Sequence, residues 1–170
     1  MLRNERVRLR AVEPEDLDLM YLIENDSSLW SLGATTVPYS RFSLKQFIDQ
    51  TRNDIFLDGQ LRLVIENENA DALGFIDLQG LEPRHRRAEV GIVLLPGYQG
   101  LGYASEALRL LSQYARQHLC LRQLVAIVAL RNEPARRLFQ RAGFTCLSTL
   151  PQWLSNGDGY EDALLWQKLF

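Results

Sequence analysis

The sequence predicts a mixed α/β fold in a single domain. A chain of 170 residues is long enough for one substantial hydrophobic core. Strand-like and helix-like patterns are interleaved along it, and a β-rich apolar run over residues 90–95 leads through a glycine-containing loop into a helical pattern. The expected order is one strand, two helices, three strands, a helix, a strand, a helix and two strands.

The first part of the chain is predicted to form a strand and two helices. Residues 6–10 alternate basic and apolar side chains, which is typical of a strand with one buried face. A helix over 14–24 follows it. A second helix over 43–51 is expected to begin at a capping box at Ser43. Residues 29–42 between them carry aromatic side chains but no clear periodicity.

The middle of the chain predicts three strands in succession. Residues 61–66 and 73–78 are apolar and alternate, and the polar stretch 67–71 between them is typical of a hairpin loop. A basic connection, 83–87, leads to the third strand, 90–95. Its arginines are predicted to be solvated loop residues, and the alternative is a role in steering an anionic ligand.

The last third predicts two helices and three strands. Asn132 is a suitable N-cap and Gly143 a suitable C-terminal stop for the second of these helices. The expected elements are a helix over 104–117, a strand over 123–130, a helix between Asn132 and Gly143, and strands over 144–150 and 160–169.

Composition excludes several classes of protein. Hydrophobic residues at 46% and charged residues at 24% are ordinary for a globular protein, and a net charge of −2 gives no general attraction to nucleic acid or to a membrane surface. No apolar stretch is long enough to span a bilayer, and the first residues lack the apolar core of a signal peptide. Two cysteines are too few for a disulfide framework or a metal site, which favours a reducing cytoplasm.

The strand, glycine loop and helix start over residues 88–106 predict an anion site. Unpaired N–H groups at a helix N-terminus and flexible glycines suit a phosphate or diphosphate. Tyr103 occupies the place of the P-loop lysine, and Ser105 that of the third Rossmann glycine, so neither of those nucleotide sites is predicted. A glycine-rich turn that serves only packing is the alternative.

The segment Gln99-Gly100-Leu101-Gly102-Tyr103-Ala104 fits the pattern Gln/Arg-x-x-Gly-x-Gly/Ala. It resembles the diphosphate loop of the GCN5-related N-acetyltransferases (GNAT), and residues 132–144 resemble the family's later Asn-x-x-Ala-x-x-x-Tyr-x-x-x-Gly-Phe segment. The resemblance implies a central mixed, mostly antiparallel sheet flanked by about four helices. It also implies acetyl-CoA as co-substrate and one N-acetyltransferase domain over 1–170.

The resemblance assigns residues to the cofactor. The end of the central strand would lie along the pantetheine, the loop would hold the diphosphate through backbone amides, and Asn132 would bond the cofactor arm. The implied cofactor-binding residues are Ile92, Val93, Leu94, Gln99, Gly100, Leu101, Gly102, Tyr103, Ala104, Ser105 and Asn132.

For the general base of acetyl transfer we select Glu89, where the family often carries an acid. An acid beside an apolar strand can have a raised pKa, and the alternative is an ordinary ion pair with Arg86 or Arg87. Phe139 stands where many members have the tyrosine that protonates the thiolate. Water could replace that acid, since a thiol is a fair leaving group.

The acceptor is expected to be a small amine or a peptide amine. Residues 85–102 and the turn 156–162 resemble the spermidine N-acetyltransferases, which favours a polyamine and at least a dimer. Acids that could hold its distal ammonium groups are Glu24, Asp26, Asp49, Asp54 and Asp58. Ribosomal-protein N-terminal acetyltransferases are similar in length and motifs, and a cofactor-binding sensor without efficient turnover is a third reading. In the family, residues 29–42 help to shape the acceptor side.

Overall fold

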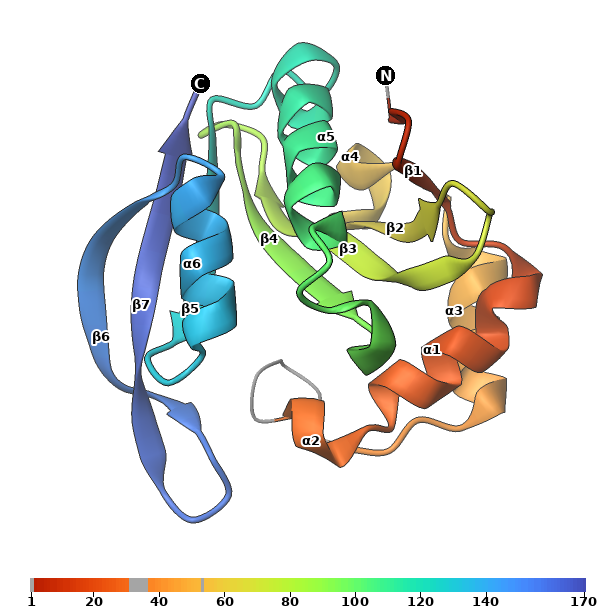
Figure 1. The fold of residues 1–170 in the computed structure, drawn as a ribbon, viewed down its shortest axis with the longest axis horizontal. Coiled ribbons are helices and arrows are strands. Elements are labelled where there is room, and N and C mark those ends of the chain that lie inside the picture. The colour runs from red at the N-terminus through yellow and green to blue at the C-terminus, as the bar shows by residue number, and fades with distance from the viewer. Residues whose placement is uncertain (1, 31–36, 53) are drawn as a thin grey trace.

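Seven strands form one sheet in the computed structural model, which describes residues 2–30, 37–52 and 54–170 (Figure 1). The strand order is β1-β2-β3-β4-β5-β7-β6; β4 and β5 are parallel and every other neighbouring pair is antiparallel. The predicted mixed, mostly antiparallel sheet is therefore confirmed. The strands are β1 (Val7–Ala11), β2 (Leu61–Asn67), β3 (Ala72–Glu82), β4 (Arg87–Leu94), β5 (Gln123–Ala129), β6 (Thr145–Ser155) and β7 (Tyr160–Leu169).

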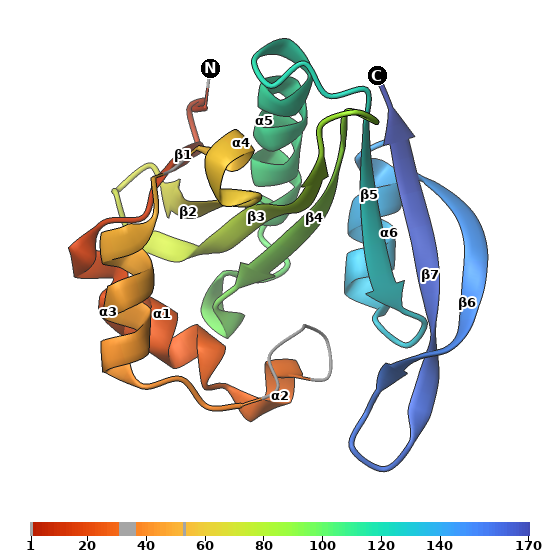
Figure 2. The ribbon, with the colours of Figure 1, turned by 180° about the vertical axis from the view of Figure 1, so that it is seen from behind.

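Helices cover both faces of the sheet (Figures 1 and 2). The four longer ones were predicted: α1 (Leu17–Glu24), α3 (Arg41–Gln50), α5 (Tyr103–Gln117) and α6 (Glu133–Arg141). The first turn of the helix predicted over 14–24 is the 3₁₀ turn η1 (Pro14–Asp16). The four-residue helices α2 (Ser27–Trp30) and α4 (Ile55–Asp58) and the 3₁₀ turn η2 (Pro96–Tyr98) were not predicted, because one turn is too short to show a period. None of the described helices is long and apolar enough to cross a membrane.

The two faces of the sheet carry separate cores. Leu63 on β2 and Ile76 on β3 pack with α5 and α6, whereas the neighbouring residues Val64 and Phe75 pack with α1 and α3. Consecutive strand residues point to opposite faces, so a strand covered on both sides buries all of them. This is why Val64 is as buried as its neighbours. An alternating strand with one buried face was too simple a prediction for β2.

Side-chain caps mark the starts of α3 and α6, and a glycine marks the end of α6. The prediction that α3 starts at Ser43 is wrong: the N-cap is Ser40, whose hydroxyl accepts the backbone N–H of Ser43 at 3.0 Å. Asn132 is the N-cap of α6, as predicted, and accepts the N–H of Ala135 at 3.2 Å. Gly143, with φ of +82°, ends that helix in the left-handed conformation that glycine permits.

The feature of the fold that matters most for function is the divergence of β4 from β5. The two strands pair only at Arg87–Gln123, Ala88–Leu124 and Glu89–Val125. Beyond Glu89 they separate, as Figures 1 and 2 show. The edge of β4 that faces β5 over residues 90–94 therefore has backbone groups that are not used in the ladder between these two strands, and such groups need partners.

Candidate active site

The glycine loop lies at the far end of the diverging part of β4. The side-chain amide of Gln99 donates to the carbonyl of Leu94 at 3.0 Å, which ties the loop back to the strand. Gly100 and Gly102 have φ of +75° and +90°, and a Cβ added at Gly100 would meet no atom within 4 Å. The loop thus combines left-handed backbone at both glycines with open space at Gly100.

The first backbone amides of helix α5 follow directly on this loop. Gly102 is its N-cap, and the first intrahelical bond runs from the N–H of Glu106 to the carbonyl of Gly102 at 3.2 Å. The N–H groups of Tyr103, Ala104 and Ser105 precede that bond and have no partner within the helix. Together with the dipole of a 15-residue helix, they make a place suited to an anion.

The residues predicted to bind the cofactor differ in what they expose. Tyr103 and Leu94 are buried, at 9% and 7% exposed, and their side chains belong to the hydrophobic core. Leu101 is 55% exposed, and Ile92 and Val93 are half-buried. The structure thus places the end of β4 and the glycine loop next to each other.

Glu89 stands where β4 and β5 part. It is the last residue of β4 paired with β5, and its side chain is half-buried. Burial raises the pKa of Glu89, and a hydrogen bond from Gln79 opposes that rise. The two arginines considered as its partners are engaged elsewhere: Arg87 pairs with Glu82, and the Nε of Arg86 donates to the carbonyl of Cys120 at 2.7 Å.

A second carboxylate lies on the same face of the sheet, and the sequence reasoning missed it. Asp77 on β3 is opposite Gly91 on β4, two positions from Glu89. Its two oxygens accept from Nε and Nη2 of Arg62 at 3.0 and 2.9 Å. Burial raises the pKa of Asp77, while the guanidinium of Arg62 opposes that rise. An acid in the middle of an apolar strand was the signal that could have identified it.

Asn132 and Phe139, the two residues of the α6 segment considered for the site, are both engaged in holding the local fold. The side-chain oxygen of Asn132 is already used as the helix cap, which leaves its amide group as the donor for a ligand. Phe139 is 3% exposed and packs edge-on against Phe144, with ring centroids 5.0 Å apart. It contributes to the core and has no proton to donate.

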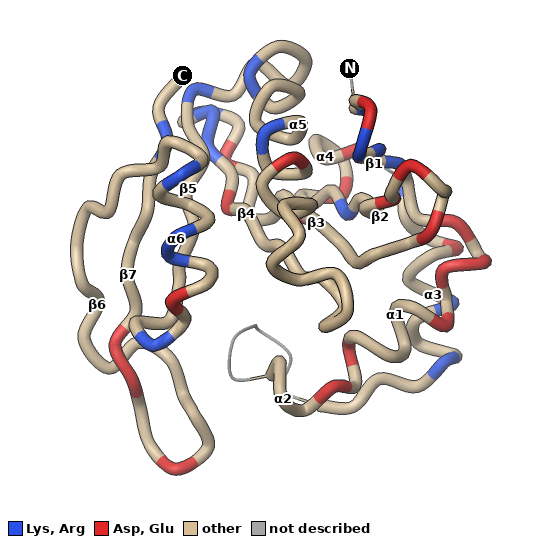
Figure 3. The backbone as a smooth tube through the Cα atoms, viewed as in Figure 1, with Lys and Arg blue, Asp and Glu red and all other residues tan. Residues whose placement is uncertain are grey.

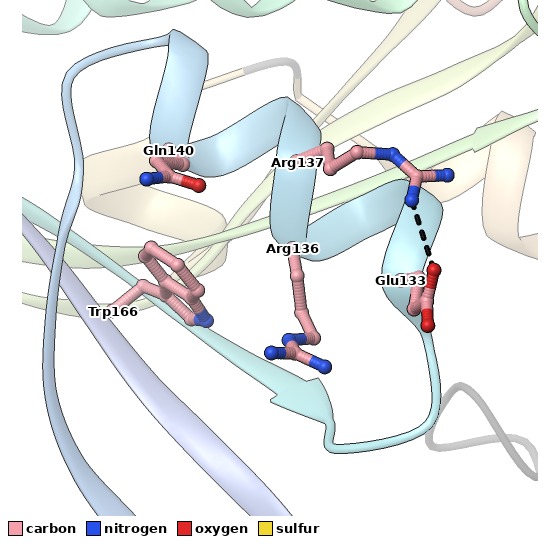
Figure 4. A pocket seen from close by; sticks show the side chains of 5 residues that line it. All are labelled: Glu133, Arg136, Arg137, Gln140 and Trp166. Atoms are coloured by element: carbon pink, nitrogen blue, oxygen red, sulfur yellow. Dashed lines mark hydrogen bonds and ion pairs between the residues drawn. The ribbon is translucent and has the colours of Figure 1, made fainter.

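A separate cavity of about 200 Å³ lies between α6 and β7 (Figure 4). An ion pair between Arg137 and Glu133, 2.9 Å long, lies at one side of it, and the indole of Trp166 lies at another. None of the predicted cofactor residues lines it. The lining residues are Glu133, Arg136, Arg137, Gln140 and Trp166.

Another cavity, of about 500 Å³, lies beside α1. It borders the segment 29–42 that the resemblance assigns to the acceptor side, of which residues 31–36 lie outside the described part of the chain. Its charged side chains include an ion pair between Arg41 and Asp18. The lining residues are Asp18, Tyr21, Leu22, Asn25, Asp26 and Arg41.

The chain matches the acetyltransferase (GNAT) domain family over residues 6–145. It therefore belongs to the GNAT family and is an acetyl-CoA-dependent N-acetyltransferase. Diverging central strands followed by a glycine loop are consistent with that class of enzyme.

The chain is similar to both a polyamine acetyltransferase and a ribosomal-protein acetyltransferase. The chain is 33% identical over 140 residues to the spermidine N(1)-acetyltransferase of Escherichia coli K12, covering 82% of this chain and 73% of that protein. It is 23% identical over 168 residues to the ribosomal-protein-serine acetyltransferase of the same organism, covering 98% and 94%.

Solved structures show the same fold. The spermidine N-acetyltransferase from Vibrio cholerae in complex with CoA and spermine superposes with a TM-score of 0.87 at 26% identity, over 98% of this chain and 96% of that one. A dodecameric structure of the Vibrio cholerae enzyme gives a TM-score of 0.82 at 26% identity, over 98% and 95%.

Proposed function

We propose that the protein transfers the acetyl group of acetyl-CoA to a primary amine of a polyamine such as spermidine or spermine. The observation that carries the proposal is the separation of β4 from β5 beyond Glu89, which ends at the glycine loop. The 33% identity to a spermidine acetyltransferase and the likeness to an enzyme crystallised with CoA and spermine support the choice of acceptor.

The cofactor is proposed to follow the diverging edge of β4. Its diphosphate would accept from the amides of residues 99–105, where the α5 dipole favours negative charge. Its pantetheine would pair with the backbone of Ile92–Leu94, whose edge β5 does not cover. The free amide group of Asn132 would donate to a carbonyl of the same arm.

Replacing Asn132 by aspartate tests that last contact. Aspartate caps a helix as well as asparagine does, so we expect an unchanged melting temperature. It cannot donate, so the KM for acetyl-CoA should rise about tenfold, the cost of one hydrogen bond. Steady-state kinetics and thermal unfolding of Asn132→Asp measure the two effects; an unchanged KM would remove Asn132 from the cofactor site.

The proposed reaction is direct attack of the amine on the thioester. Glu89 takes a proton from the ammonium group, the neutral nitrogen attacks the carbonyl carbon, and a backbone N–H of β4 polarises the carbonyl oxygen. The C–S bond then breaks, the nitrogen gives its second proton to water, and water delivers a proton to the thiolate, so that the products are the N-acetyl amine and CoA. Water can suffice at the last step because a thiol has a reference pKa of about 8.5.

Phe139→Tyr tests whether a protein acid is missing from this step. We expect no gain in kcat beyond about twofold, because protonation of a thiolate by water is not limiting. The buried site should also make the variant less stable, by about 1 kcal/mol, since the new hydroxyl enters an apolar core. A rise in kcat of tenfold or more would contradict this expectation. It would show that acetyl transfer in the wild type is limited by the absence of a tyrosine that protonates the thiolate.

The acids named as ammonium ligands, which are among the positions coloured red in Figure 3, differ in the groups that already bind their carboxylates. The carboxylate of Glu24 accepts from Arg62 at 2.5 Å. The carboxylates of Asp26 and Asp54 accept the backbone N–H groups of Ser28 and Phe56, respectively. Asp26 also lines the cavity beside α1, at the zone assigned to the acceptor. That position favours Asp26 over Glu24 for holding a distal ammonium group.

The acceptor is decided by a turnover screen. Acetyl-CoA consumption with spermidine and spermine should exceed that with N-terminal peptides. Turnover of peptides alone would favour the second candidate, a protein N-terminal acetyltransferase, which the ribosomal-protein relative supports. Tight acetyl-CoA binding without turnover on either panel would select a sensor, the reading that Phe139 favours.

Three further proposals concern the whole chain. We propose one domain over 1–170, because β7 pairs with both β5 and β6 and so joins the residues beyond 145 to the same sheet. A homo-oligomer is proposed because a structural neighbour is dodecameric and the edge strand β6 exposes Leu147 and Trp153. Two exposed free cysteines are consistent with work in a reducing cytoplasm.

A further inference from the structure

The segment that precedes β1 is attached to the start of helix α5, about a hundred positions away in the sequence. The side-chain oxygen of Asn4 accepts the backbone N–H groups of Arg6 and Val7 at 2.9 and 2.8 Å, which forms a tight turn. The amide group of the same side chain donates to the carboxylate of Glu106 at 2.6 Å. This turn therefore has a fixed position against the first turn of α5.

The turn places Arg6 on the diphosphate loop, residues 99–105. Its Nη2 donates to the carbonyl of Leu101 at 3.0 Å, and its guanidinium carbon lies 5.1 Å from the centre of the Tyr103 ring. A Cβ added to Gly102 would be only 3.4 Å from Nη1. One side chain thus contacts Leu101 and Tyr103 and lies beside Gly102, the residue between them, which has a φ of +90°.

The charge of Arg6 is available to the loop as well as its hydrogen bond. Among the described residues, no carboxylate lies within 4.0 Å of its guanidinium. A guanidinium keeps its charge at any physiological pH, and here it adds to the positive end of the α5 dipole. Its planar group can bond the Leu101 carbonyl and cover the Tyr103 ring at the same time, which an ammonium group cannot do equally well.

We propose that Arg6 is a positioning residue for the cofactor diphosphate. It holds Leu101 and Gly102 in the conformation that directs the loop amides outward, and it adds positive charge beside them. The inference rests on the proposed function, since it requires the diphosphate of acetyl-CoA to bind at this loop. It predicts that Arg6 affects donors that carry a diphosphate and not donors that lack one.

The test compares Arg6→Ala with the wild type on two acetyl donors, acetyl-CoA and S-acetyl-pantetheine, which has the same thioester but no diphosphate. For acetyl-CoA the KM should rise about tenfold, the effect of losing one charge-assisted contact. For S-acetyl-pantetheine, kcat/KM should stay within about twofold of the wild-type value. This donor has no diphosphate for Arg6 to affect, and removal of an exposed side chain should leave the fold intact. Calorimetry should show the same tenfold weakening of CoA binding.

Arg8→Ala is the matched control. Arg8 lies on the adjacent strand β1, its side chain is 58% exposed, and it pairs with Glu66 at 3.6 Å, so the variant removes an equal charge away from the loop. It should keep the wild-type KM for both donors within about twofold. An equal rise in KM in both variants would overturn the inference, because a general charge effect would then explain it.

Two further outcomes separate the inference from the function on which it rests. If Arg6→Ala loses activity equally with both donors, Arg6 supports the fold and not the diphosphate, and the inference is wrong. If wild-type protein binds CoA but Arg6→Ala binds it as tightly, the inference alone fails. If wild-type protein does not bind CoA in calorimetry, the proposed function itself fails.

Discussion

Replacing Glu89 by glutamine is expected to lower kcat for acetyl transfer about 100-fold, the lower range for loss of a general base. Glutamine has the same shape and can still bond Gln79, so the sheet should keep its stability. The KM for acetyl-CoA should change little, because no cofactor contact is assigned to this side chain. Steady-state kinetics with the acceptor selected by the turnover screen provide the measurement.

The pH dependence gives a second and independent readout of the same variant. Burial raises the pKa of Glu89, so the base becomes protonated at a higher pH than an exposed glutamate would. Activity should therefore be present above that raised pKa and be lost as the pH falls through it. In Glu89→Gln this acid limb should disappear from the profile of kcat.

Asp77→Asn is the comparison that makes the experiment decisive. Asp77 is on the same face, but Arg62 occupies both of its oxygens, so we expect mainly reduced stability and an acid limb that persists. Should the limb vanish in Asp77→Asn and persist in Glu89→Gln, the base is Asp77 and the assignment to Glu89 is wrong.

Elements longer than about two turns or five strand residues could be predicted because each carries its own period. The single-turn helices α2 and α4 could not. The extent of β6 was underestimated: the prediction stopped at Leu150, before Pro151, whereas the strand runs on to Ser155. Proline removes a ladder donor, but β6 is an edge strand, where that loss is tolerated.

The residues of the candidate site fall into two groups: those that are neighbours in the sequence, and those that only the tertiary structure brings together. The diphosphate loop and the Asn132 cap depend on residues that are neighbours in the sequence, and so a motif could identify them. Asp77 and Arg6 reach the site only through strand pairing and through the packing of the N-terminal segment on α5. Asp77 is marked only as an acid within an apolar strand, and Arg6 has no local sequence signature that indicates acetyl transfer.

Gly102→Val is expected to raise the KM for acetyl-CoA at least about 100-fold. A β-branched residue is strongly disfavoured at the φ of +90° that Gly102 adopts. Its Cβ would also approach Nη1 of Arg6 to 3.4 Å. The residue would leave the left-handed region, and the amides of Tyr103 and Ala104 would then turn away from the diphosphate, which loses several charge-assisted hydrogen bonds together.

Gly97→Val is the matched control in the same connection between β4 and α5. A Cβ at Gly97 would meet no atom within 4 Å, and its φ does not lie in the left-handed region. The control should keep its KM for acetyl-CoA within about twofold. Measuring kcat/KM with S-acetyl-pantetheine separates loss of the diphosphate site from unfolding: Gly102→Val should retain most of it. Wild-type affinity for acetyl-CoA in folded Gly102→Val would show that the left-handed loop does not hold the diphosphate.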